Sequence, residues 1–118
     1  MDWVWTGDVT IQTPGGYDCR ITKVTISPFQ AEAAYEMLEP VPEDAFLFDE
    51  LRMEALRVGG QEAKNSSYQG GLTEAGEDGF VHGSTFRGPF KRVIDPAAVE
   101  AVLIGGTWVE LDGMTLEE

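Results

Sequence analysis

Two Gly-Gly pairs separate apolar segments of this 118-residue chain, and they constrain its fold more than any other feature. Gly105-Gly106 divides VEAVLI from TWVEL, and Gly59-Gly60 divides MEALRV from QEAKN. Glycine readily adopts the positive φ angles that two-residue hairpin turns require. Each pair therefore predicts a β-hairpin, and together they favour an antiparallel, all-β chain over a helical one.

The hairpin at Gly105-Gly106 has a definite predicted register. A two-residue turn pairs Ile104 with Thr107, Leu103 with Trp108, and Val102 with Val109. One face is then almost wholly apolar, with Ile104, Val102, Val109 and Leu111, whereas the other is mixed, with Leu103, Trp108, Ala101 and Glu110. Upstream, Asp95-Pro96 predicts a capped single turn before the first strand. The alternative is a helix after Pro96, which leaves TWVEL without a partner.

The hairpin at Gly59-Gly60 predicts that Arg57 faces Glu62, with Leu56, Val58 and Ala63 on the opposite face. Opposite charges that face each other across two strands contribute about 0.2–1 kcal/mol. The alternative interpretation is a helix over FDELRMEALRV, which is rich in good helix formers.

Further strands are predicted at residues 9–12, 17–27, 29–40 and 80–88, each bounded by proline or glycine. The alternative for 29–40 is a helix, because alanine and glutamate favour helices and are rare in sheets. Within 17–27 the apolar positions change parity after Ile21, which predicts a β-bulge near Thr22-Lys23. Residues 39–50, with the apolar plug Phe46-Leu47-Phe48, and residues 65–79 are expected to be loops, and 89–94 a short edge segment.

Many short strands in one chain predict a single β-sandwich domain of about seven strands over residues 1–118. Its two sheets would pack face to face around residues that are apolar and of matching parity. The predicted core is Val24, Ile26, Val102, Ile104, Val109 and Leu111, with Tyr35 and Phe86 adding aromatic area.

Charge and composition exclude several classes of function. The formal net charge is −13 and the isoelectric point is about 4.2, which opposes binding to nucleic acid or to anionic lipid. The single cysteine, Cys19, cannot form an internal disulfide, and its alternation with Tyr17 and Ile21 predicts that it packs as a small apolar residue. No cofactor motif is present, and no apolar run reaches the roughly 18 residues of a membrane span.

The sequence contains two weak candidate binding sites. Glu74, Glu77 and Asp78 offer clustered carboxylates of the kind that Ca²⁺ prefers, but their spacing does not match a helix-loop-helix calcium site, and a solvated acidic loop is the favoured interpretation. Trp3 and Trp5 share one face of an extended segment and, with Trp108, are candidate aromatic platforms for a ligand. The alternative is that these rings cover an open edge of the sandwich.

Two blocks of the sequence resemble a known family. ITKVTISPFQAEAAYEM, at 21–37, has the form of a strand, a Ser-Pro corner and a returning strand, and VIDPAAVEAVLIGGTWVEL, at 93–111, that of an Asp-Pro turn and two strands. Together they resemble the extracytoplasmic C-terminal domains of anti-sigma-factor-like membrane proteins of Gram-positive bacteria, a family known mainly as a domain of unknown function. Residues 39–88 do not share in the resemblance.

The resemblance implies an immunoglobulin-like sandwich that acts as a non-enzymatic sensory or protein-interaction domain. Its partner would be a protein or a cell-envelope ligand, and residues 1–118 would be one part of a longer membrane-anchored protein, outside the membrane. If Met1 is the native start, a cytoplasmic location is the alternative. A second hypothesis is a carbohydrate-binding or adhesion module that uses the tryptophans, and a third is a small hydrolase with paired carboxylates in a cleft.

Overall fold

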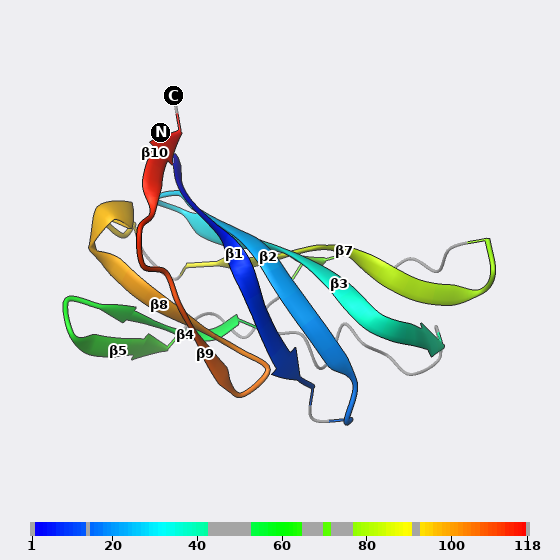
Figure 1. Ribbon diagram of the computed structural model, residues 1–118. Coiled ribbons are helices and arrows are strands. Elements are labelled where there is room, and N and C mark those ends of the chain that lie inside the picture. The colour runs from blue at the N-terminus through cyan, green and yellow to red at the C-terminus, as the bar shows by residue number, and fades with distance from the viewer. Residues whose placement is uncertain are drawn as a thin grey trace.

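The computed structural model describes residues 2–13, 15–42, 53–64, 70–71, 77–90 and 93–117, which form two antiparallel sheets packed as a β-sandwich (Figure 1). In order, the six-stranded sheet contains β10 (Thr115–Glu117), β1 (Asp2–Gln12), β2 (Asp18–Ile26), β3 (Gln30–Pro42), β7 (Phe80–Pro89) and β6 (Gly70–Gly71). The four-stranded sheet contains β5 (Gln61–Lys64), β4 (Met53–Val58), β8 (Val99–Ile104) and β9 (Thr107–Glu110). The predicted all-β class is confirmed and is consistent with an immunoglobulin-like fold, but the described residues contain ten strands rather than about seven.

Both Gly-Gly hairpins are confirmed with their predicted registers. Val102 pairs with Val109 in β8–β9, and Leu56 pairs with Ala63 in β4–β5. The four turn glycines have φ angles of 57°, 85°, 58° and 81°, all in the left-handed region that favours glycine. Residues 53–58 and 99–104 are strands, so the helical alternatives for these segments are wrong.

The turn before β8 is also as predicted. Pro96–Ala98 forms a single 3-10 turn, η3, and the Asp95 carboxylate accepts a hydrogen bond of 3.1 Å from the backbone N–H of Ala97. The capped turn directs the chain into β8 at Val99. It is the only helical segment in the parts of the chain that the structure describes.

The core lies between the two sheets and contains all six residues predicted for it from strand parity. Tyr35 is also buried, and Phe86 lies in β7, where its backbone pairs with Ala33 of β3. The core gains residues that the sequence pattern did not single out: Trp5, Ile11, Ala31, Ala33, Val41, Met53, Leu56, Val81 and Val99. Cys19 and Ile21 complete the inner face of β2, and Cys19 is fully buried, as expected for a small apolar residue.

Irregularities in the six-stranded sheet adjust which side chains face the core. The register between β2 and β3 shifts between Ile21 and Lys23, which confirms the predicted bulge and explains why Ile21 and Val24 are both buried. A second shift, between Thr6 and Val9, interrupts the pairing of β1 with β2. β1 nevertheless runs as one long strand from Asp2 to Gln12, which contains the short segment predicted at 9–12.

Several predicted loops and edges are wrong where the structure describes them. β3 continues to Pro42, so the first part of 39–50 is strand, and Phe46-Leu47-Phe48 lies outside the described residues. Gly70–Gly71, within the predicted loop 65–79, pairs with Arg87 and Phe86 of β7. Pro89 ends β7 opposite Gln30, and the described residues that follow it up to Ile94 are not strand.

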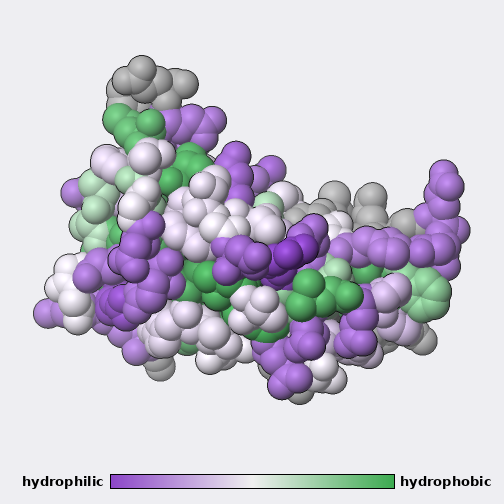
Figure 2. Space-filling view, in the orientation of Figure 1, coloured by the Kyte–Doolittle hydropathy of each residue, from purple (hydrophilic) through white to green (hydrophobic). Residues whose placement is uncertain are grey.

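The first and last strands lie side by side. β10 pairs with β1, so that Asp2 faces Glu117 and Trp3 faces Leu116, and both ends of the chain meet at one end of the molecule (Figure 1). Much of the face seen in Figure 2 is polar, with apolar residues at the surface near this end. None of the helical structure among the described residues is long and apolar enough to cross a membrane.

Candidate functional site

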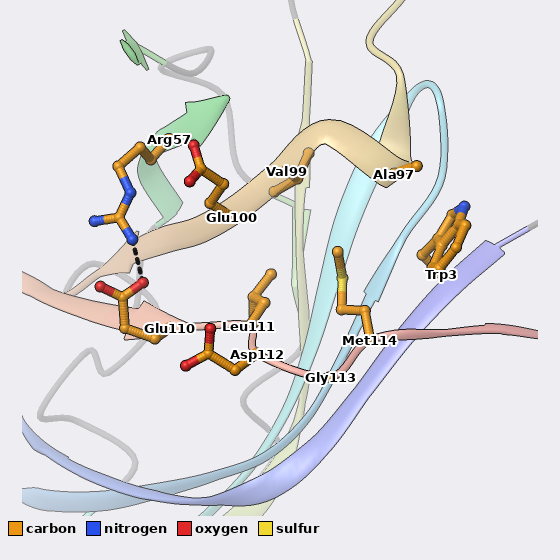
Figure 3. Close-up of a pocket in the computed structure, with 10 residues that line it drawn as sticks. All are labelled: Trp3, Arg57, Ala97, Val99, Glu100, Glu110, Leu111, Asp112, Gly113 and Met114. Carbon is orange, nitrogen blue, oxygen red and sulfur yellow. Dashed lines mark hydrogen bonds and ion pairs between the residues drawn. The ribbon is translucent and has the colours of Figure 1, made fainter. Parts of the chain in front are cut away.

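A groove forms where the chain leaves the four-stranded sheet for the six-stranded one. The backbone N–H of Leu111 donates a 2.9 Å hydrogen bond to the carbonyl of Glu100, the last contact that continues the β8–β9 ladder. A turn at Asp112-Gly113, with φ of 78° at Gly113, then carries the chain away, and Thr115 joins β1 opposite Val4. The space between this crossing segment and the start of β8 is a cavity of about 320 Å³ (Figure 3).

We name this cavity the crossover groove and define it by the residues that line it. They are Trp3, Arg57, Ala97, Val99, Glu100, Glu110, Leu111, Asp112, Gly113 and Met114. They come from β1, β4, η3, β8, β9 and the crossing segment, so elements of both sheets form the site.

One end of the crossover groove is apolar. Trp3 stands beside Ala97 at this end, with Met114 between Trp3 and the middle of the groove (Figure 3). Trp3 and Met114 are partly buried and pack against the hydrophobic core. The apolar end is therefore anchored, while part of each side chain remains open to solvent.

The other end of the groove is strongly polar and holds three carboxylates against one guanidinium. Arg57 forms an ion pair with Glu110 and lies 5.7 Å from the ring centroid of Trp108, a distance typical of a cation–π contact. Glu100 accepts a hydrogen bond from the backbone N–H of Gly60. The guanidinium thus neutralises one carboxylate, and the remaining negative charge belongs to Glu100 and Asp112.

Asp112 differs from the other two acids of the groove. It is exposed, and no residue in the described ranges forms a hydrogen bond or an ion pair with its carboxylate. It projects from the crossing segment between Glu110 and Met114, at the junction of the polar and apolar ends (Figure 3). The site therefore joins an apolar surface to a carboxylate that is available for a ligand.

The three tryptophans predicted as ligand platforms have different surroundings. Trp3 and Trp5 do share one face of β1, but that face points inward, and Trp5 is 7% exposed within the core. Trp3 lines the crossover groove, and Trp108 is partly buried beneath Arg57 on the outer face of β9. Trp5 is thus not an exposed platform, whereas Trp3 remains available to a ligand.

The carboxylates predicted as a weak calcium site are only partly described. Glu77 and Asp78 are exposed in the turn before β7, and Glu74 lies outside the described residues. Asp78 accepts a 3.0 Å hydrogen bond from the backbone N–H of Phe80 and lies 2.7 Å from Nε2 of His82, and these contacts hold its pKa below the usual range. No group of three potential metal ligands occurs among the described residues.

Cys19 has no catalytic surroundings in the described structure. It is fully buried on the inner face of β2, and burial raises the pKa of its thiol to about 12. The pKa of Tyr35 is also raised to about 12, first by burial and second by the nearby Cys19. A thiol this hard to ionise is a packing group rather than a nucleophile.

Comparisons with known proteins identify no relative. No family model, no curated protein and no solved structure matches the chain.

Of the residues that line the groove, sequence reasoning singled out only Trp3 as a binding residue. The signal it missed was Asp112-Gly113, a turn pair directly after the last predicted strand, which marks the point where the chain can leave its sheet.

Proposed function

We propose that this chain is a non-enzymatic binding domain of the kind that anti-sigma-factor-like regulators carry outside the cell membrane, and that the crossover groove is its ligand site. The fold class and the two blocks of family resemblance support this role. The observation that carries it is the position of the groove, whose wall at 112–114 runs directly into β10 beside β1. A ligand in the groove would touch the segment that holds the first and last strands together.

A mechanism follows from that position. A ligand changes a conformational equilibrium only when it binds one state more tightly than the other. A molecule that contacts both Trp3 and the 112–114 segment binds best when β10 is docked on β1, because only then are both walls present. Ligand binding would therefore stabilise the paired end of the domain, and a membrane-anchored regulator would transmit that change toward its sigma-binding segment.

Binding fits the groove better than catalysis does. A carboxylate pair that performs acid–base chemistry needs one carboxyl kept protonated, usually by burial. Glu100, Glu110 and Asp112 are all exposed, and Glu110 is held by Arg57. The three acids are arranged to attract a ligand rather than to transfer protons, which favours a binding module over the hydrolase hypothesis.

Fractionation of cells that make this protein tests the proposal. An antibody raised against residues 1–118 should detect a membrane-associated protein larger than 12.9 kDa. Protease added outside intact cells should remove the epitope, whereas a cytoplasmic marker should survive. A 12.9 kDa band confined to the cytoplasmic fraction would rule out the regulator.

A carbohydrate-binding module is the second candidate, favoured by the exposure of Trp3 in the groove. Aromatic rings bind the flat faces of sugars, but of the three predicted tryptophans Trp3 alone lines the groove. Cell-wall glycans should then change the intrinsic fluorescence of the wild type and leave that of Trp3→Leu unchanged. Fluorescence that stays constant across a glycan panel would remove this candidate.

A further inference from the structure

The charge and shape of the crossover groove restrict the chemistry of its ligand. Three carboxylates and one guanidinium line the polar end, so an anionic ligand would be repelled there. The whole chain, at −13, adds to the attraction for cations and to the repulsion of anions. Because Arg57 already satisfies Glu110, an incoming cation would meet Asp112 and the second oxygen of Glu100.

The apolar end sets a second requirement. Trp3 and Met114 line the groove on the far side of Asp112 from Arg57 (Figure 3). A bare inorganic cation would leave these side chains uncovered, and a purely apolar molecule would leave Asp112 without a partner. Only a ligand with both a cationic and an apolar part matches both ends.

We propose that the crossover groove binds an ammonium group carried on an apolar stem, with the ammonium at Asp112 and the stem against Met114 and Trp3. This inference deepens the proposed function and rests on the groove being its ligand site. An ammonium group satisfies the carboxylate, and an aliphatic stem covers the apolar side chains of Met114 and Trp3. A lysine side chain of a partner protein and a free alkylamine share this chemistry.

Three probes of equal length separate the contributions of charge and apolar contact. Hexylammonium, hexanol and hexanoate each contain six carbons, the sixth being the carboxylate carbon in hexanoate, and they differ in the head group. They would be titrated into ¹⁵N-labelled protein while the amide signals of Asp112, Gly113 and Met114 and the indole N–H of Trp3 are followed. Hexylammonium should shift these signals most, hexanol less, and hexanoate not at all.

Matched variants assign the effect to the groove. Asp112→Asn should weaken hexylammonium binding about two- to fivefold, the range of an exposed ion pair. Asp18→Asn removes the same charge at the start of β2, where Asp18 pairs with Gln12 at the end of β1, and should leave binding unchanged. Trp3→Leu leaves less apolar surface for the stem to contact, and should also weaken binding. Unchanged amide dispersion elsewhere verifies that each variant is folded.

Certain outcomes would overturn the proposal. Equal binding of hexanol and hexylammonium would show that only apolar contact matters, and binding of hexanoate would contradict the predicted charge preference. Equal weakening by Asp112→Asn and Asp18→Asn would point to net charge alone.

A lysine-containing peptide that binds tighter than hexylammonium identifies a protein as the source of the amine, whereas tighter binding of the alkylamine identifies a small molecule. If the protein binds hexylammonium but fractionates to the cytoplasm, the proposed regulator function is wrong, while the proposed ammonium ligand of the groove still holds.

Discussion

Arg57 and Glu110 form an ion pair although their strands, β4 and β9, are not neighbours in the sheet. β8 lies between them, and its residue Ala101 pairs with both Arg57 and Glu110. Ala101 is completely buried, and its short side chain leaves room for the guanidinium to cross the strand. Glu62, which faces Arg57 across the hairpin as predicted, is therefore not its ion-pair partner.

A double-mutant cycle measures the interaction between Arg57 and Glu110. Both side chains are a third or more exposed, so solvent screens them and we expect a coupling of about 0.2–1 kcal/mol in the free energy of unfolding. Urea denaturation of Arg57→Met, Glu110→Gln and the double variant gives that value. The coupling should shrink in high salt, and its absence at low salt would contradict the structure.

The Trp5 ring occupies the space that a side chain at Gly7 would fill. A methyl group at position 7 would overlap Cζ2 of Trp5 and lie 2.9 Å from Cη2, so Gly7→Ala must displace the ring. We expect a loss of about 1–3 kcal/mol in the free energy of unfolding and a red-shifted tryptophan emission. In a Trp5→Phe background the indole atoms Cζ2 and Cη2 are absent, so Gly7→Ala should lower the free energy of unfolding by less. An equal cost in both backgrounds would place the conflict elsewhere.

Two leucines provide a matched test of the core. Leu56 is 1% exposed and belongs to the core, whereas Leu116, on β10, is 39% exposed. Leu56→Ala should lower the free energy of unfolding by about 2–5 kcal/mol because it leaves a cavity. Leu116→Ala, measured in the same denaturant titration, should cost less than about 1 kcal/mol. Comparable losses would show that β10 is buried more deeply than the structure indicates.

The buried thiol makes stability depend on alkaline pH. Burial raises the pKa of Cys19 from 9.0 to about 12, so the unfolded chain loses the thiol proton at a lower pH than the folded chain. The resulting stability is complete below pH 9 and is lost as the pH rises from 9 toward 12, at up to about 1.4 kcal/mol per pH unit. Tyr35 contributes in the same direction above pH 10. The free energy of unfolding, measured by urea titration at a series of pH values, should fall more steeply with pH above pH 9 in the wild type than in Cys19→Ala. Parallel pH dependences of the two proteins would contradict this.

Local patterns in the sequence predicted the local parts of the fold. The Gly-Gly pairs fixed two hairpins, because a two-residue turn leaves only one register. Apolar parity in β2 located its bulge, because a change of parity must be absorbed where it occurs. β10 was missed because Thr115, Leu116 and Glu117 are all exposed and no apolar alternation marks them.

The site could not be predicted in the same way, because it depends on contacts between distant segments. Trp3 and Met114 line the same groove only because the chain crosses from one sheet to the other after Leu111. Arg57 reaches Glu110 only because β4 and β9 flank the same strand. Neither relation has a local signal, whereas the burial of Trp5 matches the parity of Ile11, which is buried in the same strand.

The pairing of Asp2 with Glu117 determines how the domain would respond to mechanical tension. A pull that separates the two ends acts across the ladder between β1 and β10, so it breaks hydrogen bonds one pair at a time instead of shearing them together. Only three residue pairs stand between the load and the segment at 112–114. Stretching would therefore peel this segment off before the longer ladder between β1 and β2 separates, and a molecule seated there would raise the force required.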